Sequence, residues 1–153
     1  MAYDSTEHTI GHGKIIEYAA ASNMTGATRI YGTKEINSPE AELGATETTN
    51  DDTPDFHKGK MPGMYEPGTI GVTYQYAKTE FAKLEALKLL PTVANTRASA
   101  TKWWRITWPD GSTSLGQGFV TKNGLSGEQE DGVEAEAEIE CVGKWTFTPY
   151  VAP

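Results

Sequence analysis

The sequence predicts a mainly β fold: a β-sandwich or small barrel with one short flanking α-helix and one long extended loop. Several segments alternate apolar and polar residues with a period of two, and the longest of them is Val133–Val142. A strand sends successive side chains to opposite faces, so this alternation is typical of a half-buried strand. Sixteen glycines and eight prolines supply many turns, and only one segment has apolar residues at helical spacing. A length of 153 residues fits a single domain.

The first third of the chain predicts an arm followed by two strands. Residues 1–12 are polar without periodicity and are expected to form a flexible N-terminal arm, ahead of a single β-domain over residues 13–148. Strands are expected over Lys14–Ala20 and over Thr28–Ile36, the second interrupted at Gly32.

Residues 40–67 are rich in Thr, Asp, Gly and Pro, and a structureless loop of this length is uncommon in a compact domain. This segment either forms an extended hairpin, around Glu42–Thr48 and Gly59–Met64, or becomes ordered only against a partner. Its apolar groups would then mark a contact surface between subunits. The candidate interface residues are Asp51, Asp52, Asp55, Met61, Met64 and Tyr65.

A strand and then the helix are expected next. Thr69–Tyr76 alternates well, and Thr79 is placed to cap a helix that ends before Pro91. The apolar face of this helix is expected to consist of Phe81, Leu84 and Leu87.

The remainder predicts four strands and a short tail over residues 149–153. Trp104 and Trp108 are expected in the core, and Gly116 and Gly118 indicate a close backbone approach or a bulge. In order, the expected segments are strand Lys102–Trp108, turn Pro109–Gly111, strand Thr113–Val120, loop Lys122–Asp131, strand Val133–Val142 and strand Lys144–Thr148.

The strand at Val133–Val142 has an unusual polar face. The apolar face is expected to consist of Val133, Ala135, Ala137, Ile139 and Cys141. The other face carries four acidic residues about 7 Å apart. Like charges in a row repel, and Glu is a poor strand former, so this face costs stability. Such a cost is more readily explained if the acidic face has a function. Two interpretations stay open: a solvated outer face or a functional acidic wall. The acidic residues are Glu134, Glu136, Glu138 and Glu140.

The composition argues against several classes of function. A net charge of −8 disfavours binding to nucleic acid through phosphate contacts, although it suits a surface that a polyanion must slide past. No secretory signal and no apolar run of membrane-spanning length is found. The single cysteine allows no intrachain disulfide.

No catalytic residues, cofactor or metal site are expected. His8 and His12 lack a third ligand. His57 lies near an acidic cluster that does not match the calcium-loop pattern. No nucleophile triad or contrasting pair of carboxylates is visible.

The order of these segments resembles the tail tube proteins of long-tailed phages, of the lambda-like kind. The resemblance covers roughly residues 13 to 147 and depends on succession and patterning. It rests on a Thr- and Asp-rich segment over residues 45–52, the short helix, the Trp108–Gly111 turn, the return strand with Gly118-Phe119-Val120, and the strand from Asp131-Gly132-Val133 to Val142-Gly143.

The resemblance implies a structural virion protein, made in the host cytoplasm, that assembles into hexameric rings stacked as a hollow tube. It implies a tape-measure protein inside the tube during assembly, tail-tip and terminator proteins as further partners, and DNA that passes without specific binding. It makes residues 40–67 a contact to a neighbouring subunit and the four glutamates candidates for the channel wall. A monomeric carbohydrate- or ligand-binding module that uses Trp103 or Trp145 is the alternative, and a secretion-system tube of similar fold is a related possibility.

Overall fold

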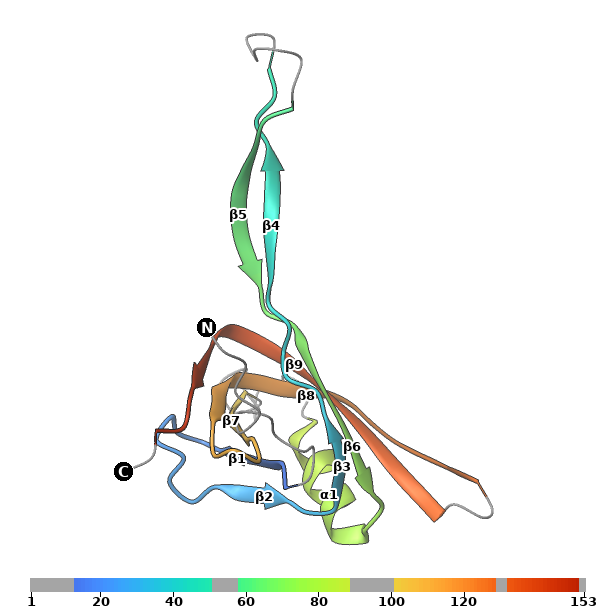
Figure 1. Cartoon of the computed structure of the whole chain (residues 1–153). Helices are drawn as coiled ribbons and strands as arrows, with labels where there is room; N and C mark the ends of the chain where they lie inside the picture. Colours follow the sequence, from blue (N-terminus) through green and yellow to red (C-terminus); the bar gives the residue numbers. More distant parts are fainter. Residues whose placement is uncertain (1–12, 51–57, 89–100, 129–131, 152–153) are drawn as a thin grey trace, which may run out of the picture.

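The computed structural model describes residues 13–50, 58–88, 101–128 and 132–151. The described residues form nine strands and one α-helix, so the predicted mainly β fold with a single short helix is confirmed (Figure 1). The elements in chain order are β1 (Ile15–Ala19), β2 (Thr28–Ile30), β3 (Thr33–Ile36), β4 (Glu42–Glu47), β5 (Lys60–Glu66), β6 (Thr69–Gln75), α1 (Lys78–Leu87), β7 (Lys102–Thr107), β8 (Thr113–Glu128) and β9 (Gly132–Thr148).

Seven strands form one antiparallel sheet in the order β2-β1-β7-β8-β9-β6-β3, and β4 and β5 form a separate two-stranded ribbon. Strands β8 and β9 are much longer than the others, with 16 and 17 residues. The beginning of β8 pairs with β7, and the beginning of β9 pairs with β6. The sheet therefore has two halves, and the two long strands run through both.

The two halves face each other across one hydrophobic core. Buried side chains from β1 and β7 belong to the same cluster as those from β6, β9 and α1, as in a sandwich whose long strands pass from one layer to the other. One bulge in β8, at Thr121, and one in β9, between Val142 and Thr146, allow the two long strands to bend between the layers. Among the described residues β2 and β3 are not paired with each other, so the sheet is not a closed barrel. The largest fully buried side chains are Trp104, Tyr74, Ile16, Ile30, Ile70, Leu84, Ile106 and Ile139.

Helix α1 covers one opening of the folded sheet. Leu84 and Leu87 are buried and Phe81 packs against the core, so the predicted apolar face is confirmed. The predicted cap is wrong: the helix begins at Lys78, ahead of Thr79, and its first flanking residue, Ala77, makes no side-chain capping bond. Thr79 therefore lies inside the first turn, where its hydroxyl is not in a capping position.

The helix also ties the two edges of the sheet together. Tyr31 and Gly32 lead directly from edge strand β2 to the opposite edge strand β3. The buried Glu80 accepts a hydrogen bond from the Tyr31 N–H at 3.1 Å. Lys83 lies 3.0 Å from the Glu80 carboxylate and donates to the Arg29 carbonyl at 3.4 Å. One helix face thus holds the crossing between the edges in place.

Two predictions for the second half were wrong. The expected loop Lys122–Asp131 is largely strand, because β8 continues to Glu128 and pairs with β9 to the end; residues 129–131 lie outside the described residues. The two strands expected around Gly143 are one strand, β9. Gly143 has a φ of +69°, so the strand bends there without ending.

Candidate functional surfaces: a glutamate row and a projecting ribbon

The glutamate row, defined as Glu134, Glu136, Glu138 and Glu140, lies on the outer face of β9. Ala135, Ala137, Ile139 and Cys141 alternate with it and are buried, so the predicted two faces of this strand are confirmed. Val133 was expected on the buried face but is 47% exposed, because it lies near the end of the β8–β9 hairpin, beyond the core.

The row lies between β6 and β8. On β6 the register places Thr69, Gly71, Thr73 and Gln75 beside the four glutamates, and on β8 it places Phe119, Lys122, Gly124 and Ser126 beside them. Glu136, which lies between Thr73 and Gly124, is exposed, and the other three glutamates are half-buried. The row is an accessible acidic surface.

Two members of the row have cationic partners. Glu134 pairs with Lys34 of β3, and Glu138 pairs with Lys122 of β8 at 3.4 Å. Among the described residues, Glu136 and Glu140 have no ion pair. Both pairs are exposed, so each is expected to stabilise the fold by at most about 1 kcal/mol.

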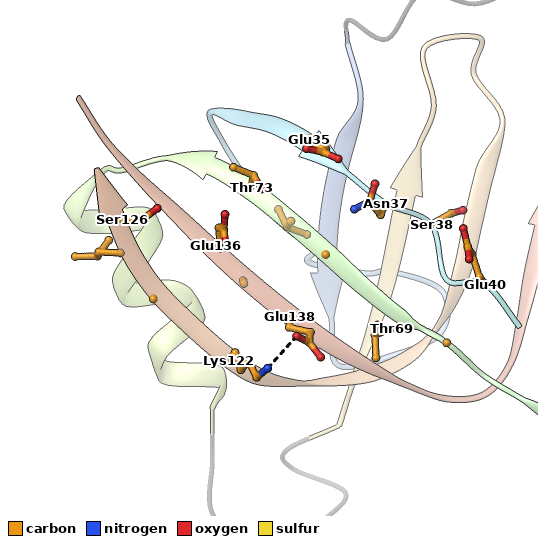
Figure 2. A pocket seen from close by; sticks show the side chains of 16 residues that line it. Glu35, Asn37, Ser38, Glu40, Thr69, Thr73, Lys122, Ser126, Glu136 and Glu138 are labelled. Carbon is orange, nitrogen blue, oxygen red and sulfur yellow. Dashed lines mark ion pairs between the residues drawn. The ribbon is translucent and has the colours of Figure 1, made fainter. Parts of the chain in front are cut away.

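An open trough extends the acidic surface across β3, β6, β9 and β8. Figure 2 shows Glu35 and Glu136 on this face, with the ion pair between Lys122 and Glu138 near one end. Four glutamates and one lysine line the trough, so its charge is strongly negative. They are Glu35, Glu40, Glu136, Glu138 and Lys122.

The β4–β5 ribbon is the second candidate surface. It extends away from the body of the molecule (Figure 1), which confirms the hairpin alternative for residues 40–67. All of its residues are exposed except Gly63, which is half-buried. Among the predicted interface residues, Met61 is 52% exposed, Met64 87% and Tyr65 69%. Asp51, Asp52 and Asp55 lie outside the described residues.

Further exposed apolar groups were not predicted as contact residues. Leu43 lies opposite Tyr65 on the ribbon. It is a single apolar residue in a segment rich in Thr and Glu, so the sequence only weakly indicated that it is a contact residue. Phe147 and Tyr150 are 61% and 58% exposed near the C-terminal end of β9. The alternation of Trp145 and Phe147 predicted a strand over Lys144–Thr148 but did not indicate that Phe147 is exposed.

The tryptophans form no open platform. Trp104 is buried, and Trp103, Trp108 and Trp145 are half-buried. The Trp145 indole N–H donates to the Gln117 carbonyl at 3.1 Å, and its ring covers Gly116. A sugar-binding surface built on Trp103 or Trp145 would need an exposed ring face, so the structure disfavours the binding-module alternative.

No metal or membrane site is visible in the part of the chain that the structure describes. No three His, Cys, Asp or Glu side chains are grouped there to hold a metal ion. The described helix is too short and too polar to cross a bilayer.

Comparisons with known proteins identify the fold. No family model and no curated protein matches this chain. The tail of an empty gene transfer agent particle with C6 symmetry matches with a TM-score of 0.65 and 12% identity, over 92% of this chain and 99% of that chain.

Two other solved structures agree. The six-fold symmetrised baseplate of the anti-feeding prophage matches with a TM-score of 0.66 and 8% identity, over 97% of this chain and 98% of the other. The SPP1 tail tube matches with a TM-score of 0.53 and 14% identity, over 94% of this chain and 80% of the other. This chain therefore has the fold of phage tail tube proteins; the lambda-like kind is not singled out.

Proposed function

We propose that this chain is a structural virion protein, the subunit of a phage tail tube that assembles with copies of itself into stacked rings. The observation that carries the proposal is the β4–β5 ribbon. Leu43, Met61, Met64 and Tyr65 are exposed on it, and none of them belongs to the core cluster. A two-stranded ribbon is marginally stable in water by itself. Packing against another copy would bury these groups, and the shared fold supports the same conclusion.

Unpaired strand edges support ring formation. Among the described residues, the part of β8 after Gly118 has no paired strand on the side where β7 ends, and the outer edge of β3 is unpaired. Natural proteins protect such edges. Pairing of β8 in one copy with β3 in the next would join the sheets into a continuous barrel. Two similar structures have six-fold symmetry, which supports a hexameric ring with a formal charge of six times −8, or about −48.

The glutamate row is proposed to face the channel of this tube. In a barrel built from these edges, one face of β3, β6, β9 and β8 would line the lumen, and the face opposite the core is the one available. An acidic wall offers no groups for binding phosphate and repels DNA, so DNA would pass without specific contacts.

The remaining parts of the proposal concern partners and location. A tape-measure protein would fill the channel during assembly, and tail-tip and terminator proteins would bind the ends of the tube. The subunit would be made in the host cytoplasm and would become part of the virion tail. The role is structural and not enzymatic.

Negative-stain microscopy of the purified full chain at high concentration, with and without tail-tip partners, tests the assembly. The expected result is tubes with a central channel. A protein that stays monomeric in both conditions would overturn the proposal.

A charge series tests the channel wall. Glu136 and Glu140 form no ion pair among the described residues, so Gln or Lys at both positions should leave fold and tube intact. The rate of DNA ejection should be lower in the Gln variant than in the wild type, because the repulsion between the wall and the DNA phosphates is removed. It should be lowest in the Lys variant, because the lysines attract the phosphates. Normal infectivity of the Lys phage would remove the lumen assignment and leave the tube proposal standing.

A further inference from the structure

Two unlike apolar patches lie at opposite ends of the β8–β9 pair. The hairpin-end patch consists of Tyr76, Leu125 and Val133, which are 40%, 51% and 47% exposed. The Tyr76 N–H donates to the Val133 carbonyl at 3.0 Å, and Leu125 lies opposite Ala135, next to Val133 on the core-facing side. These side chains therefore continue the inner face of the sheet past the end of the core.

The C-terminal patch consists of Phe147, Tyr150 and Val151, of which Val151 is 79% exposed. The Tyr150 N–H donates to the Ser112 hydroxyl at 3.1 Å, which holds this segment against the turn before β8. Exposed aromatic side chains held in a fixed position are typical of protein contact surfaces.

The two patches cannot cover each other within one chain. Figure 1 shows the hairpin end of β9 and the C terminus on opposite sides of the molecule. Up to about 46 Å of strand separates Val133 from Phe147, at about 3.3 Å per residue. Two different patches on opposite sides of one subunit suit a head-to-tail contact, which closes into a ring when repeated with a constant rotation.

Charge disfavours a contact between two hairpin ends. Glu136 lies near the hairpin end of β9 and has no cationic partner among the described residues. Two charged residues lie beside the C-terminal patch: the exposed Lys144, which has no ion pair among the described residues, and Asp110, whose carboxylate accepts from the Ser112 hydroxyl. Joining two hairpin ends would bring the Glu136 carboxylates of both copies together, whereas a head-to-tail contact places that carboxylate against an end that carries both signs of charge.

We propose that the hairpin-end patch of one copy binds the C-terminal patch of a second copy, in a head-to-tail contact around the ring. The inference rests on the proposed tube function and specifies a contact that it requires. It lies alongside the pairing of sheet edges and is separate from the β4–β5 ribbon, which is left for contacts between rings.

Complementary charge variants of the full chain test the contact. One variant carries Leu125→Lys and Val133→Lys, the other Phe147→Lys and Val151→Lys. All four side chains are exposed, so thermal melts should remain close to that of the wild type. Each variant alone is expected to be monomeric by native mass spectrometry. An equal mixture should give a one-to-one dimer and nothing larger, because one intact junction forms and both outer ends are blocked.

The matched control carries Leu43→Lys and Met61→Lys, two substitutions of similarly exposed apolar residues on the ribbon. This control should still form rings, although the rings should stack poorly. Patch variants that assemble like the wild type would overturn the contact and leave the tube function intact. A one-to-one dimer from the mixture, with no tube from the wild type, would support the contact and overturn the tube function.

Engineered cysteines give a second readout if a lysine variant does not fold. Cys141 is buried and should not react, so Leu125→Cys and Phe147→Cys each add one accessible thiol. Oxidation of the mixture should yield disulfides between the two different variants. Disulfides formed mainly within each variant alone would overturn the head-to-tail arrangement.

Discussion

At the scale of residues, β8 carries glycines at the two positions where tryptophan side chains pack against it. The indole N–H of Trp104 donates to the Gly118 carbonyl at 3.1 Å, and Trp145 covers Gly116. A Cβ atom on Gly116 would lie 2.4 Å from the Trp145 ring. Gly116 thus makes a close approach, and the bulge that the sequence offered as the alternative lies opposite it on β9, where four residues span the stretch that two residues span on β8.

Gly116→Ala should lower the free energy of unfolding by about 1–3 kcal/mol, because the added methyl group overpacks the indole of Trp145. Gly124→Ala is the matched control on the same strand: it has nothing within 4 Å, and the change should stay within about 0.5 kcal/mol. Denaturant melts followed by tryptophan fluorescence measure both. Equal stability of the two variants would contradict the contact.

Because the Cys141 thiol is buried, we expect the folded protein to lose stability at alkaline pH. Burial, with a smaller effect of the Glu140 carboxylate, raises the pKa of Cys141 from 9.0 to about 12. The unfolded chain therefore ionises first, and the free energy of unfolding should fall as pH rises from about 9 towards 12. Burial also raises the pKa of Tyr74 to about 12, which acts in the same direction.

Melts of the wild type and of Cys141→Ala across this pH range measure the effect. The variant should lose less stability than the wild type between pH 9 and pH 12. At pH 8, a thiol reagent should label Cys141 only after unfolding. Rapid labelling of the native protein would show that the thiol is accessible.

At the scale of elements, one carboxylate, that of Glu80, connects helix α1 to the crossing between the two edges of the sheet. Glu80 receives the Tyr31 N–H and pairs with Lys83, at the crossing between the two edges of the sheet. Glu85 and Lys88 form a pair with the same spacing on the exposed side of the helix, with side chains 38% and 40% exposed. The two pairs differ mainly in burial.

Glu80→Gln should destabilise the fold by about 1–3 kcal/mol, since a charge-assisted hydrogen bond is weakened and Lys83 loses its partner. Glu85→Gln, the exposed control, should cost at most about 0.5 kcal/mol. Chemical denaturation with a constant m-value measures the difference. Similar losses in both variants would mean that the crossing does not depend on Glu80.

The ribbon should be separable from the folded body, because β4 and β5 pair only with each other. Replacing residues 42–66 by a short Gly-Ser turn should give a folded protein that melts within a few degrees of the wild type. It should form no long tubes in electron microscopy. Loss of the folded state would show that the ribbon is needed for folding.

Most elements could be predicted because their patterns are local. Alternation located β6 and β9, and Gly32 marked the break between β2 and β3. The second half of β8 could not be predicted, because Gly124 and Gly127 weaken a strand that only pairing with β9 specifies. The glutamate face was predictable from period two. The exposure of Phe147 and Tyr150 was not, since it depends on where the long strands end.

At the scale of the whole molecule, the net charge opposes the proposed assembly. Each copy carries −8, and bringing copies together concentrates that charge. Added salt should therefore promote the formation of tubes, because screening weakens repulsion between exposed charges.

Light scattering at increasing sodium chloride concentration tests this expectation at fixed protein concentration. The protein concentration needed for assembly should fall between about 0.01 M and 0.15 M salt, where the Debye length shrinks from about 30 Å to 8 Å. Tubes that dissociate as salt rises would show that ion pairs between subunits dominate.

The central position of β8 and β9 determines when this protein can fold during synthesis. The hydrogen bond between Arg105 and Glu17 joins residues 88 positions apart, so β1 cannot pair with β7 until β7 has left the ribosome. In the same way, β6 cannot pair with β9 until β9, which ends at Thr148, has been synthesised. The pairs β1–β2, β3–β6 and β4–β5 can form earlier, but they are joined into one sheet only when translation is almost finished, and during that interval the nascent chain is most exposed to aggregation and most in need of chaperones.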